Sequence, residues 1–247
     1  MKLHPTQIRE IKMKKILLSL SLLLFSGIAG LFISYGSVNK TNNQTPDPNA
    51  VVINGVQWAK CNIDKPGTFA AAPEKSGMFY QWNNNIGWSA TNPIVSSNGS
   101  KKWPDYNPNC STKDGYMITK WSTANDPSPK GWRLPTIDEY RTLLDTEKVS
   151  SEWTKQNGVN GRKFTDKKTG QSIFFPAAGH RVDTSVEIEE DTKKLYEVGE
   201  NGYYWNSGSS ELDNECIMNF SRGRASLDPT LGFLVNNGGL SIRCVKE

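Results

Sequence analysis

The clearest pattern in the chain is a short strand, a corner and an amphipathic helix in direct succession. Residues 132–134 alternate apolar and polar side chains, and Pro135 disfavours helical backbone for the residue before it. Thr136 and Glu139 have the spacing of a capping box, which predicts a helix that starts at Thr136 and runs to about Lys148. Apolar residues then recur every three or four positions on one face, which must pack on a core: Ile137, Tyr140, Leu143 and Leu144.

Alternating apolar positions predict further strands joined by tight turns. Residues 51–63 alternate around Asn54-Gly55, a strong signal for a two-residue hairpin. Residues 161–181 contain two strand-like runs that flank a turn at Lys167 to Gly170. Three more short strands are expected near the C-terminal end of the chain, at residues 202–205, 216–220 and 240–245. We therefore expect an α+β fold of short antiparallel strands with one or two helices and long loops.

The first part of the chain has the pattern of a targeting segment. A basic step at Lys14-Lys15 is followed by no charged residue from Ile16 to Val38. Residues 1–36 are therefore interpreted as a secretory leader, with a signal anchor as the alternative, and residues 37–50 as a polar linker. We expect an exported protein that is secreted or held at the cell surface or outer membrane. It would contact a membrane only through an uncleaved leader.

The net charge of the 247-residue chain belongs to this leader. Residues 1–36 hold five of the 29 Lys and Arg and one of the 25 Asp and Glu, so the rest of the chain has 24 of each. A neutral domain lacks the basic surface that nucleic-acid binding requires, and no nucleic-acid partner is expected. The remaining residues, about 200, suffice for one domain with a sizeable core, at residues 51–247.

All four cysteines lie after the leader, and no two of them form a C-x-x-C pair. In an exported chain this favours disulfides, and four cysteines allow three connectivities. Spacing does not choose among them, and buried free thiols are the alternative.

The chain offers few residues for catalysis or for binding metals. His180 is the one histidine after the leader, glycine-rich phosphate loops are absent, and the acidic run of Glu187, Glu189 and Glu190 has no calcium-loop spacing. A solvated surface explains that run more simply than a metal site does. We expect no metal, no cofactor and no catalytic residue.

One region has a composition suited to recognition. Residues 205–239 combine polar side chains with aromatic residues over a scaffold of short strands, and such loops are common binding sites. The alternative is that they are only soluble loops. The candidate ligand-binding residues are Trp205, Asn206, Ser207, Arg222, Arg224, Asp228, Asn236 and Asn237.

Several linked motifs together resemble one known family. They are WAKCNIDKPGTF (58–69), YQWN (80–83), DPSPKGWRLPTIDEYRTLLD (126–145), EWTKQNGVNGRKFTDKKTGQSIFFPAAGHR (152–181), GYYWNS (202–207) and GLSIRCV (239–245). In this order, over about residues 51–247, they resemble the Fibrobacter succinogenes major paralogous domain family of secreted and surface proteins.

The resemblance implies a C-type-lectin-like fold, shared with the formylglycine-generating, sulfatase-modifying enzymes. It further implies that the first and last strands lie side by side, with Cys61 paired to Cys244 and Cys110 to Cys216. Many relatives carry cysteine where Ser128 stands, so Cys244 must find another partner here or stay free. Neither the reactive cysteine pair of those enzymes nor the calcium motif of sugar-binding lectins is recognisable.

The function that these patterns and the resemblance imply is a non-catalytic binding module at the cell surface. Its C-terminal loops would hold a glycan or a protein. Two alternatives stay open, namely a structural surface protein and an enzyme of the sulfatase-modifying type that uses Cys216 or Cys244 as its nucleophile.

Overall fold

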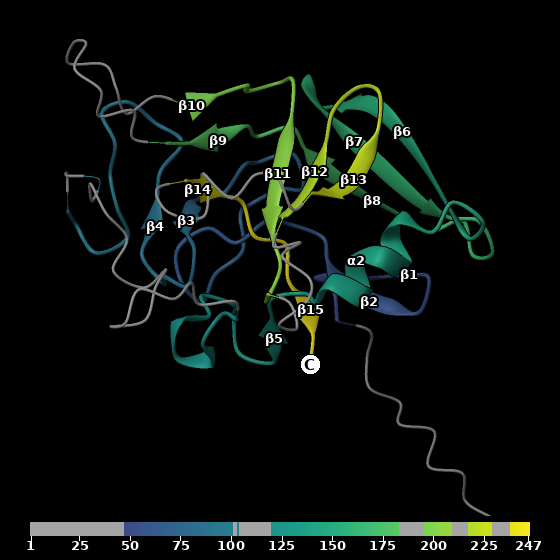
Figure 1. Cartoon of the computed structure of the whole chain (residues 1–247), viewed down its shortest axis with the longest axis horizontal. Coiled ribbons are helices and arrows are strands. Elements are labelled where there is room, and N and C mark those ends of the chain that lie inside the picture. Colours follow the sequence, from purple (N-terminus) through teal and green to yellow (C-terminus); the bar gives the residue numbers. More distant parts are fainter. Residues whose placement is uncertain (1–46, 101–102, 104–119, 183–194, 209–216, 229–237) are drawn as a thin grey trace, which may run out of the picture. The chain divides into compact units, whose positions relative to one another are not determined.

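The computed structural model describes residues 47–100, 103, 120–182, 195–208, 217–228 and 238–247 (Figure 1). The chain divides into two units, Met1–Thr45 and Pro46–Glu247, and all of these residues belong to the second. The predicted leader, the acidic run at Glu187 to Glu190 and the candidate residues Asn236 and Asn237 lie outside the described residues.

The expected α+β, C-type-lectin-like class is wrong, because strands dominate the described chain. They form four sheets in which every pair of neighbouring strands is antiparallel. The helical structure among the described residues is one eight-residue α-helix, α2 (Ile137–Leu144), and one 3-10 turn, η1 (Thr123–Asn125).

The first sheet joins both ends of the compact unit. Its strand order is β1 (Ala50–Ile53), β2 (Val56–Ala59), β15 (Val245–Lys246) and β5 (Trp132–Arg133). The Asn54-Gly55 hairpin is confirmed, since both turn residues have positive φ, 46° and 83°. The expected neighbourhood of the first and last strands is confirmed by the pairing of Val245 with Trp58. Nearby, Lys246 Nζ lies 2.6 Å from Asp47 Oδ2.

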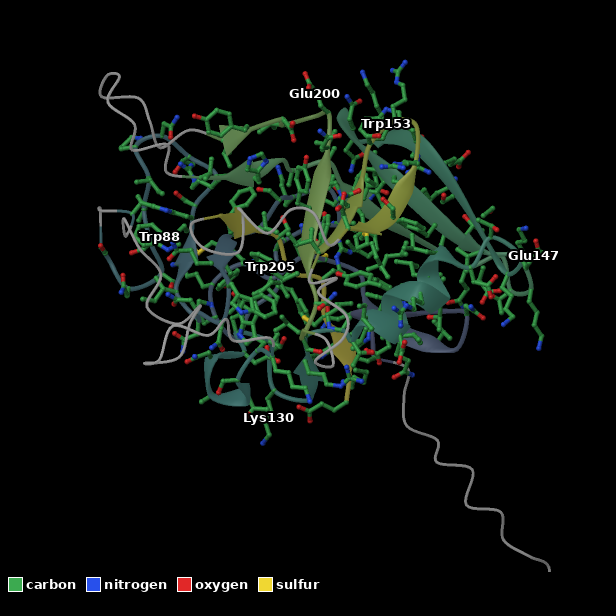
Figure 2. All side chains as sticks on the ribbon, in the orientation of Figure 1. Trp88, Lys130, Glu147, Trp153, Glu200 and Trp205 are labelled. Carbon is green, nitrogen blue, oxygen red and sulfur yellow. The ribbon has the colours of Figure 1, made fainter. Side chains whose placement is uncertain are left out.

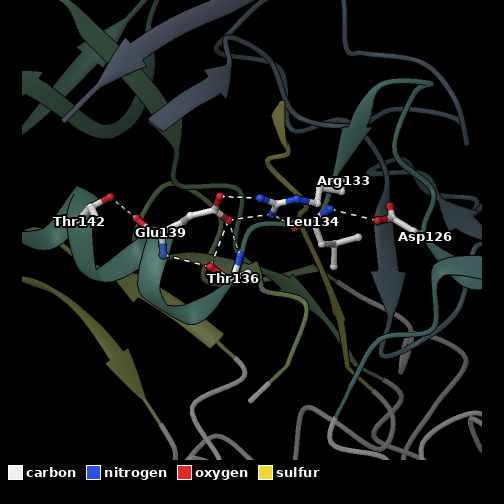
Figure 3. Close-up of polar contacts among 6 residues, drawn as sticks. All are labelled: Asp126, Arg133, Leu134, Thr136, Glu139 and Thr142. Atoms are coloured by element: carbon white, nitrogen blue, oxygen red, sulfur yellow. Dashed lines mark hydrogen bonds and ion pairs between the residues drawn. The ribbon is translucent and has the colours of Figure 1, made fainter. Parts of the chain in front are cut away.

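The start of α2 is the predicted capping box, and an ion pair reinforces it (Figure 3). Glu139 N donates to Thr136 Oγ1 at 3.2 Å, and Thr136 N donates to Glu139 Oε2 at 2.7 Å. The Glu139 carboxylate also accepts two bonds from the Arg133 guanidinium, at 2.8 and 2.7 Å. Asp126 Oδ2 accepts from Leu134 N at 3.1 Å and fixes the corner. The helix is thereby held to the strand before it.

The helix is shorter than predicted. It ends at Leu144, because Asp145 leaves the helical conformation (ψ 97°) and its carbonyl accepts from the N–H groups of Lys148 and Val149. The strand β6 (Val149–Gln156) begins directly there. The sequence pattern missed β6, because Val149 is its one buried residue and no alternation marks it.

The strand β6 opens the sheet β6, β7 (Val159–Asp166) and β8 (Ser172–Pro176), and the predicted turn at Lys167 to Gly170 joins β7 to β8. A further sheet has the order β10 (Leu195–Tyr196), β9 (His180–Arg181), β14 (Gly239–Leu240), β3 (Phe79–Gln81) and β4 (Gly87–Trp88). The single strand expected over residues 240–245 is thus two strands, β14 and β15, in different sheets.

The sheet β11 (Gly202–Trp205), β12 (Ile217–Phe220) and β13 (Ala225–Asp228) contributes to two apolar clusters. Side chains of a strand alternate between its faces. Tyr204, Met218 and Phe220 enter one cluster with Trp58 and Phe175 of other sheets. Trp205 and Ile217, on the opposite face, enter the other cluster. That cluster also holds Trp82 and Trp121. Both faces of one end of the sheet are therefore buried.

Candidate functional site

Trp205 is part of the core and cannot contact a ligand. Its side chain is fully buried, and its Nε1 donates to Tyr80 O at 2.7 Å. Its ring centroid lies 5.2 Å from that of Trp82 and 6.2 Å from that of Trp121. The prediction of a surface aromatic is wrong here, because the type of an aromatic residue does not tell a core ring from an exposed one.

Asn206 and Ser207 also have structural roles. Asn206 is fully buried, and its Oδ1 accepts from Gly208 N at 2.8 Å. Ser207 N donates to Pro135 O at 2.7 Å, and Ser207 O accepts from Trp121 N at 2.9 Å. These bonds attach the end of β11 to the corner before α2. Asn206 is therefore no surface contact for a ligand, and the backbone of Ser207 braces that corner.

The structure brings two predicted residues, Arg224 and Asp228, together at one cavity of about 190 Å³. The cavity lies on the sheet β11–β13, at the end that carries the β12–β13 turn. Arg222 is exposed on the same turn but does not line the cavity. The cavity is lined by Asn201, Tyr203, Asn219, Phe220, Ser221, Arg224 and Asp228. In Figure 2 the label of Glu200 marks the region just before β11.

Strand register explains why polar residues meet on this face. Tyr203 of β11 is opposite Asn219 of β12, which is opposite Ser226 of β13. Asn219 Nδ2 donates to Asp228 Oδ2 at 3.1 Å, and Ser226 Oγ donates to Asn219 Oδ1 at 3.1 Å. Directly opposed residues point to the same side of a sheet, so the row is continuous. Alternation along residues 217–220 could have revealed Asn219 as a position on this face.

One wall of the cavity is held by a hydrogen-bonded cluster. Tyr203 donates from its hydroxyl to Glu197 Oε2 at 2.5 Å, and Nδ1 of His180 lies 3.7 Å from the same oxygen. Burial and then the Glu197 carboxylate raise the pKa of Tyr203 well above its usual value. Burial raises the pKa of Glu197, but hydrogen bonds from Tyr203 and Asn201 outweigh it, so the net direction is downward. Tyr203 therefore stays a neutral donor, and Glu197 stays charged.

Glu197 has a left-handed backbone conformation, with φ of 56°. Its carbonyl accepts from the N–H groups of Glu200 and Asn201, both at 3.0 Å. Non-glycine residues rarely adopt this conformation, and surrounding contacts must hold them there. The turn before β11 is thus fixed with its carboxylate aimed at Tyr203.

The opposite wall, the β12–β13 turn, is braced from below by Arg162 of β7. Arg162 is 5% exposed. Its Nη2 donates to Ser221 O at 3.0 Å and to Arg222 O at 3.2 Å, and its Nη1 donates to Ser151 Oγ at 2.9 Å. The turn itself closes through Ser221 N and Arg224 O, 2.9 Å apart. The backbone that carries Arg224 is therefore rigid.

The cavity is suited to binding through hydrogen bonds and charge. Arg224 supplies up to five donors, Asp228 accepts, and the Asn219 amide does both. Among the residues that the structure describes, no group of three or more His, Cys, Asp or Glu side chains could hold a metal ion.

The two cysteines in the described part of the chain, Cys61 and Cys244, are free thiols, so the pair Cys61–Cys244 that the resemblance implied is wrong. Cys61 follows β2 and Cys244 precedes its neighbour β15, but the buried Cys244 side chain lies in the apolar cluster and faces the hydroxyl of Ser128, without full hydrogen-bond geometry. Burial raises the pKa of Cys244 to about 12 and also raises the pKa of Cys61. Both thiols are thus protonated at neutral pH. Cys110 and Cys216 lie outside the described residues.

Within the part of the chain that the structure describes, no helix has the length and apolar character needed to cross a membrane. None of the curated proteins and none of the solved structures matches the chain. A family model does match, and the match extends over residues 51–246. Since this is most of the chain and nearly all of the compact unit, the protein belongs to the Fibrobacter succinogenes major domain family.

Proposed function

We propose that this protein is an exported, non-catalytic surface module that binds a glycan in the cavity on the sheet β11–β13. The observation that carries the proposal is the row of polar side chains, Tyr203, Asn219 and Asp228, on a rigid sheet. Sugar rings are recognised by planar amide and carboxylate groups that pair with hydroxyls, next to an aromatic edge. Each of these groups lines the cavity.

The size of the cavity favours a glycan over an extended protein surface. Pockets for drug-sized ligands have roughly 300–1,000 Å³. At about 190 Å³ this cavity is smaller and would take one sugar residue of a longer chain. A glycan would then present a terminal or side residue, while the rest of it stays in solvent.

Two further features support a binding role without covalent chemistry. The thiols of Cys61 and Cys244 have raised pKa values, which is opposite to what a reactive cysteine needs. The uncharged segment from Ile16 to Val38 supports export to the cell surface. Cell fractionation, with the N-terminus of the recovered protein sequenced, tests export, and recovery in the cytoplasm with an intact N-terminus would contradict it.

The binding test uses the compact unit Pro46–Glu247 on a mixed array of glycans and matrix proteins. We expect a glycan to bind, and Asn219→Ala to weaken it by about tenfold, because the amide and its bond to Asp228 are lost. The matched control is Asn49→Ala, since Asn49 is exposed and lies before β1, outside the cavity.

If the parent and Asn219→Ala bind a glycan equally well, the glycan binds outside this cavity. No bound glycan in any position of the array would sink the proposal and favour a structural surface protein. If a matrix protein binds the parent but not Asn219→Ala, the cavity is the binding site and its ligand is a protein, not a glycan.

A further inference from the structure

The charge of Arg224 has no partner in the cavity. Its side chain is exposed, and it makes no hydrogen bond or ion pair with any residue that the structure describes. Asp228 lines the same cavity, and its Oδ2 accepts a hydrogen bond from the Asn219 amide at 3.1 Å. The guanidinium of Arg224 is therefore available to a ligand, on a turn that hydrogen bonds from Arg162 hold in place.

Neighbouring charges make this end of the cavity positive. Arg162 is buried beneath the turn and donates to the neutral oxygens of Ser151, Ser221 and Arg222. Burial lowers its pKa from 12.5, but an arginine stays charged in proteins. Arg222 adds a third guanidinium, exposed on the turn. Against these three cations stands Asp228, the acidic side chain that lines the cavity.

The carboxylate of Glu197, which contacts the cavity-lining Tyr203, is already engaged. Its Oε2 accepts from the Tyr203 hydroxyl and lies near His180. Its carboxylate is thereby directed at the Tyr203 hydroxyl. The cavity has a cationic end with free donors and an amide and carboxylate end at Asn219 and Asp228.

We infer that the cavity selects an anionic sugar residue, with its oxyanion on Arg224 and its ring hydroxyls on Asn219 and Asp228. A planar guanidinium binds carboxylate or sulfate oxygens with two parallel hydrogen bonds, which is stronger than a bond to a neutral hydroxyl. The shared chemistry is an oxyanion on a polyhydroxylated ring. It can come from a uronic acid or from a sulfate ester. The inference rests on the proposed function and adds the class of ligand.

The experiment compares sugars of the same backbone that differ in their charged groups, by calorimetry with the full chain. Oligogalacturonate is paired with its neutral, fully methyl-esterified form, and chondroitin sulfate with its chemically desulfated form, which keeps its uronate carboxylates. We expect oligogalacturonate to bind more tightly than its neutral ester, or chondroitin sulfate to bind more tightly than its desulfated form, or both. A preference for oligogalacturonate identifies a carboxylate as the ligand group, and loss of affinity on desulfation identifies a sulfate.

Two arginine variants of the same turn separate the site from a diffuse charge effect. We expect Arg224→Gln to weaken the anionic sugar by about tenfold or more and to leave a neutral sugar unchanged. Arg222→Gln is the matched control, because Arg222 is exposed on the turn but does not line the cavity. It should change the affinity by less than about twofold, because Arg222 acts on the ligand only through a charge that salt screens, whereas Arg224 contacts it directly.

The outcomes separate this inference from the proposed function. Equal losses in Arg222→Gln and Arg224→Gln would show a nonspecific basic patch and overturn the inference. Tight binding of a neutral sugar, unaffected by Arg224→Gln but lost in Asn219→Ala, would overturn it while the proposed function stands. Binding of polyglutamate as tight as that of the sugars, and equally sensitive to Arg224→Gln, would overturn it in favour of an acidic peptide. Failure of all sugars, charged and neutral, would overturn the proposed function itself.

Discussion

Arg243 donates from Nε to Oδ1 of Asn62 across 2.8 Å, and both side chains are fully buried. The other donors of Arg243 reach backbone carbonyls. Nη1 donates to the carbonyl of Ala59 at 3.1 Å and to that of Lys60, and Nη2 donates to the carbonyl of Phe174 at 3.1 Å. The guanidinium also lies 4.6 Å from the centroid of the Phe175 ring. Arg243 therefore joins the sheet of β1, β2, β15 and β5 to the sheet of β6, β7 and β8.

Replacing Arg243 should lower the free energy of unfolding of the domain more than replacing any exposed arginine does. Arg243→Met removes the donor from two buried carbonyls, from the half-buried carbonyl of Lys60 and from the Asn62 amide oxygen, and each buried loss costs about 1–3 kcal/mol. We expect the free energy of unfolding in urea to fall by about 3 kcal/mol or more. The matched control is Arg222→Met, which should change it by less than about 0.5 kcal/mol. Similar losses in both variants would contradict the role of Arg243.

Ser128→Cys should create a disulfide with Cys244, because the Ser128 side chain faces the buried Cys244 thiol. We expect the cross-link in peptide maps of the oxidised variant and a gain in stability of up to about 4 kcal/mol that is lost with reductant. Ser128→Ala serves as the control without a second thiol. Two free thiols after oxidation would show that the sulfur atoms cannot meet.

The domain should lose the part of its stability that comes from the capping box when the pH becomes acidic. Burial raises the pKa of Glu139, but bonds from Arg133 and Thr136 outweigh it and lower the folded value below 4.5. The unfolded state therefore binds this proton first as pH falls, so the contribution is complete above about 4.5 and is lost as pH falls through the folded pKa.

Glu139→Gln should thus lower the free energy of unfolding by about 1–2 kcal/mol at pH 7, through the lost cap and ion pair. The difference should shrink toward pH 3. Glu152→Gln is the matched control, because Glu152 forms an exposed pair with Lys163 at 2.5 Å. It should cost less than about 0.5 kcal/mol at any pH. A pH-independent difference for Glu139→Gln would argue against the carboxylate as the cause.

His180 should titrate below its usual range. Burial lowers the pKa of His180 from 6.5, and the charge of Glu197 opposes this in part. The unfolded chain binds the proton first as pH falls below about 6.5, so stability from this group is present above 6.5 and is lost as pH falls toward the folded pKa.

NMR of the compact unit, which holds His180 as its one histidine, measures this pKa directly. Glu197→Gln removes the opposing charge and should lower the midpoint further. Glu200→Gln, three residues on, should leave it unchanged. A midpoint at or above 6.5 in the parent would contradict burial as the dominant cause.

Local features of the fold were predictable where one residue type dictates a conformation. The capping box at Thr136 and the Asn54-Gly55 turn were predicted correctly, because side-chain hydrogen bonds and positive φ are local requirements. The fold class was not, since it depends on strands such as β6, in which all residues but Val149 are exposed or half-buried and no periodicity is seen. The lengths of strands and helices were decided by tertiary pairing, as the split of residues 240–245 between two sheets shows.

The site was predictable in part. Arg224 and Asp228 were named from composition, and the structure places both at one cavity. Trp205 was misassigned because its position among three packed tryptophan rings depends on residues distant in sequence. Tyr203 and Asn219 were missed because their shared face follows from the pairing of β11 with β12, two four-residue strands that are not joined by a short turn.

The ion pair of Asp47 with Lys246 has a consequence for how this domain can be used. Asp47 and Lys246 lie near the two ends of the compact unit, so the ion pair holds these ends close together, beside the paired strands β2 and β15 (Figure 1). A short linker could join them, so the chain is open to circular permutation with new ends in an exposed turn such as Lys167 to Gly170. For the same reason the whole domain could be inserted into a surface loop of a host protein as a cassette.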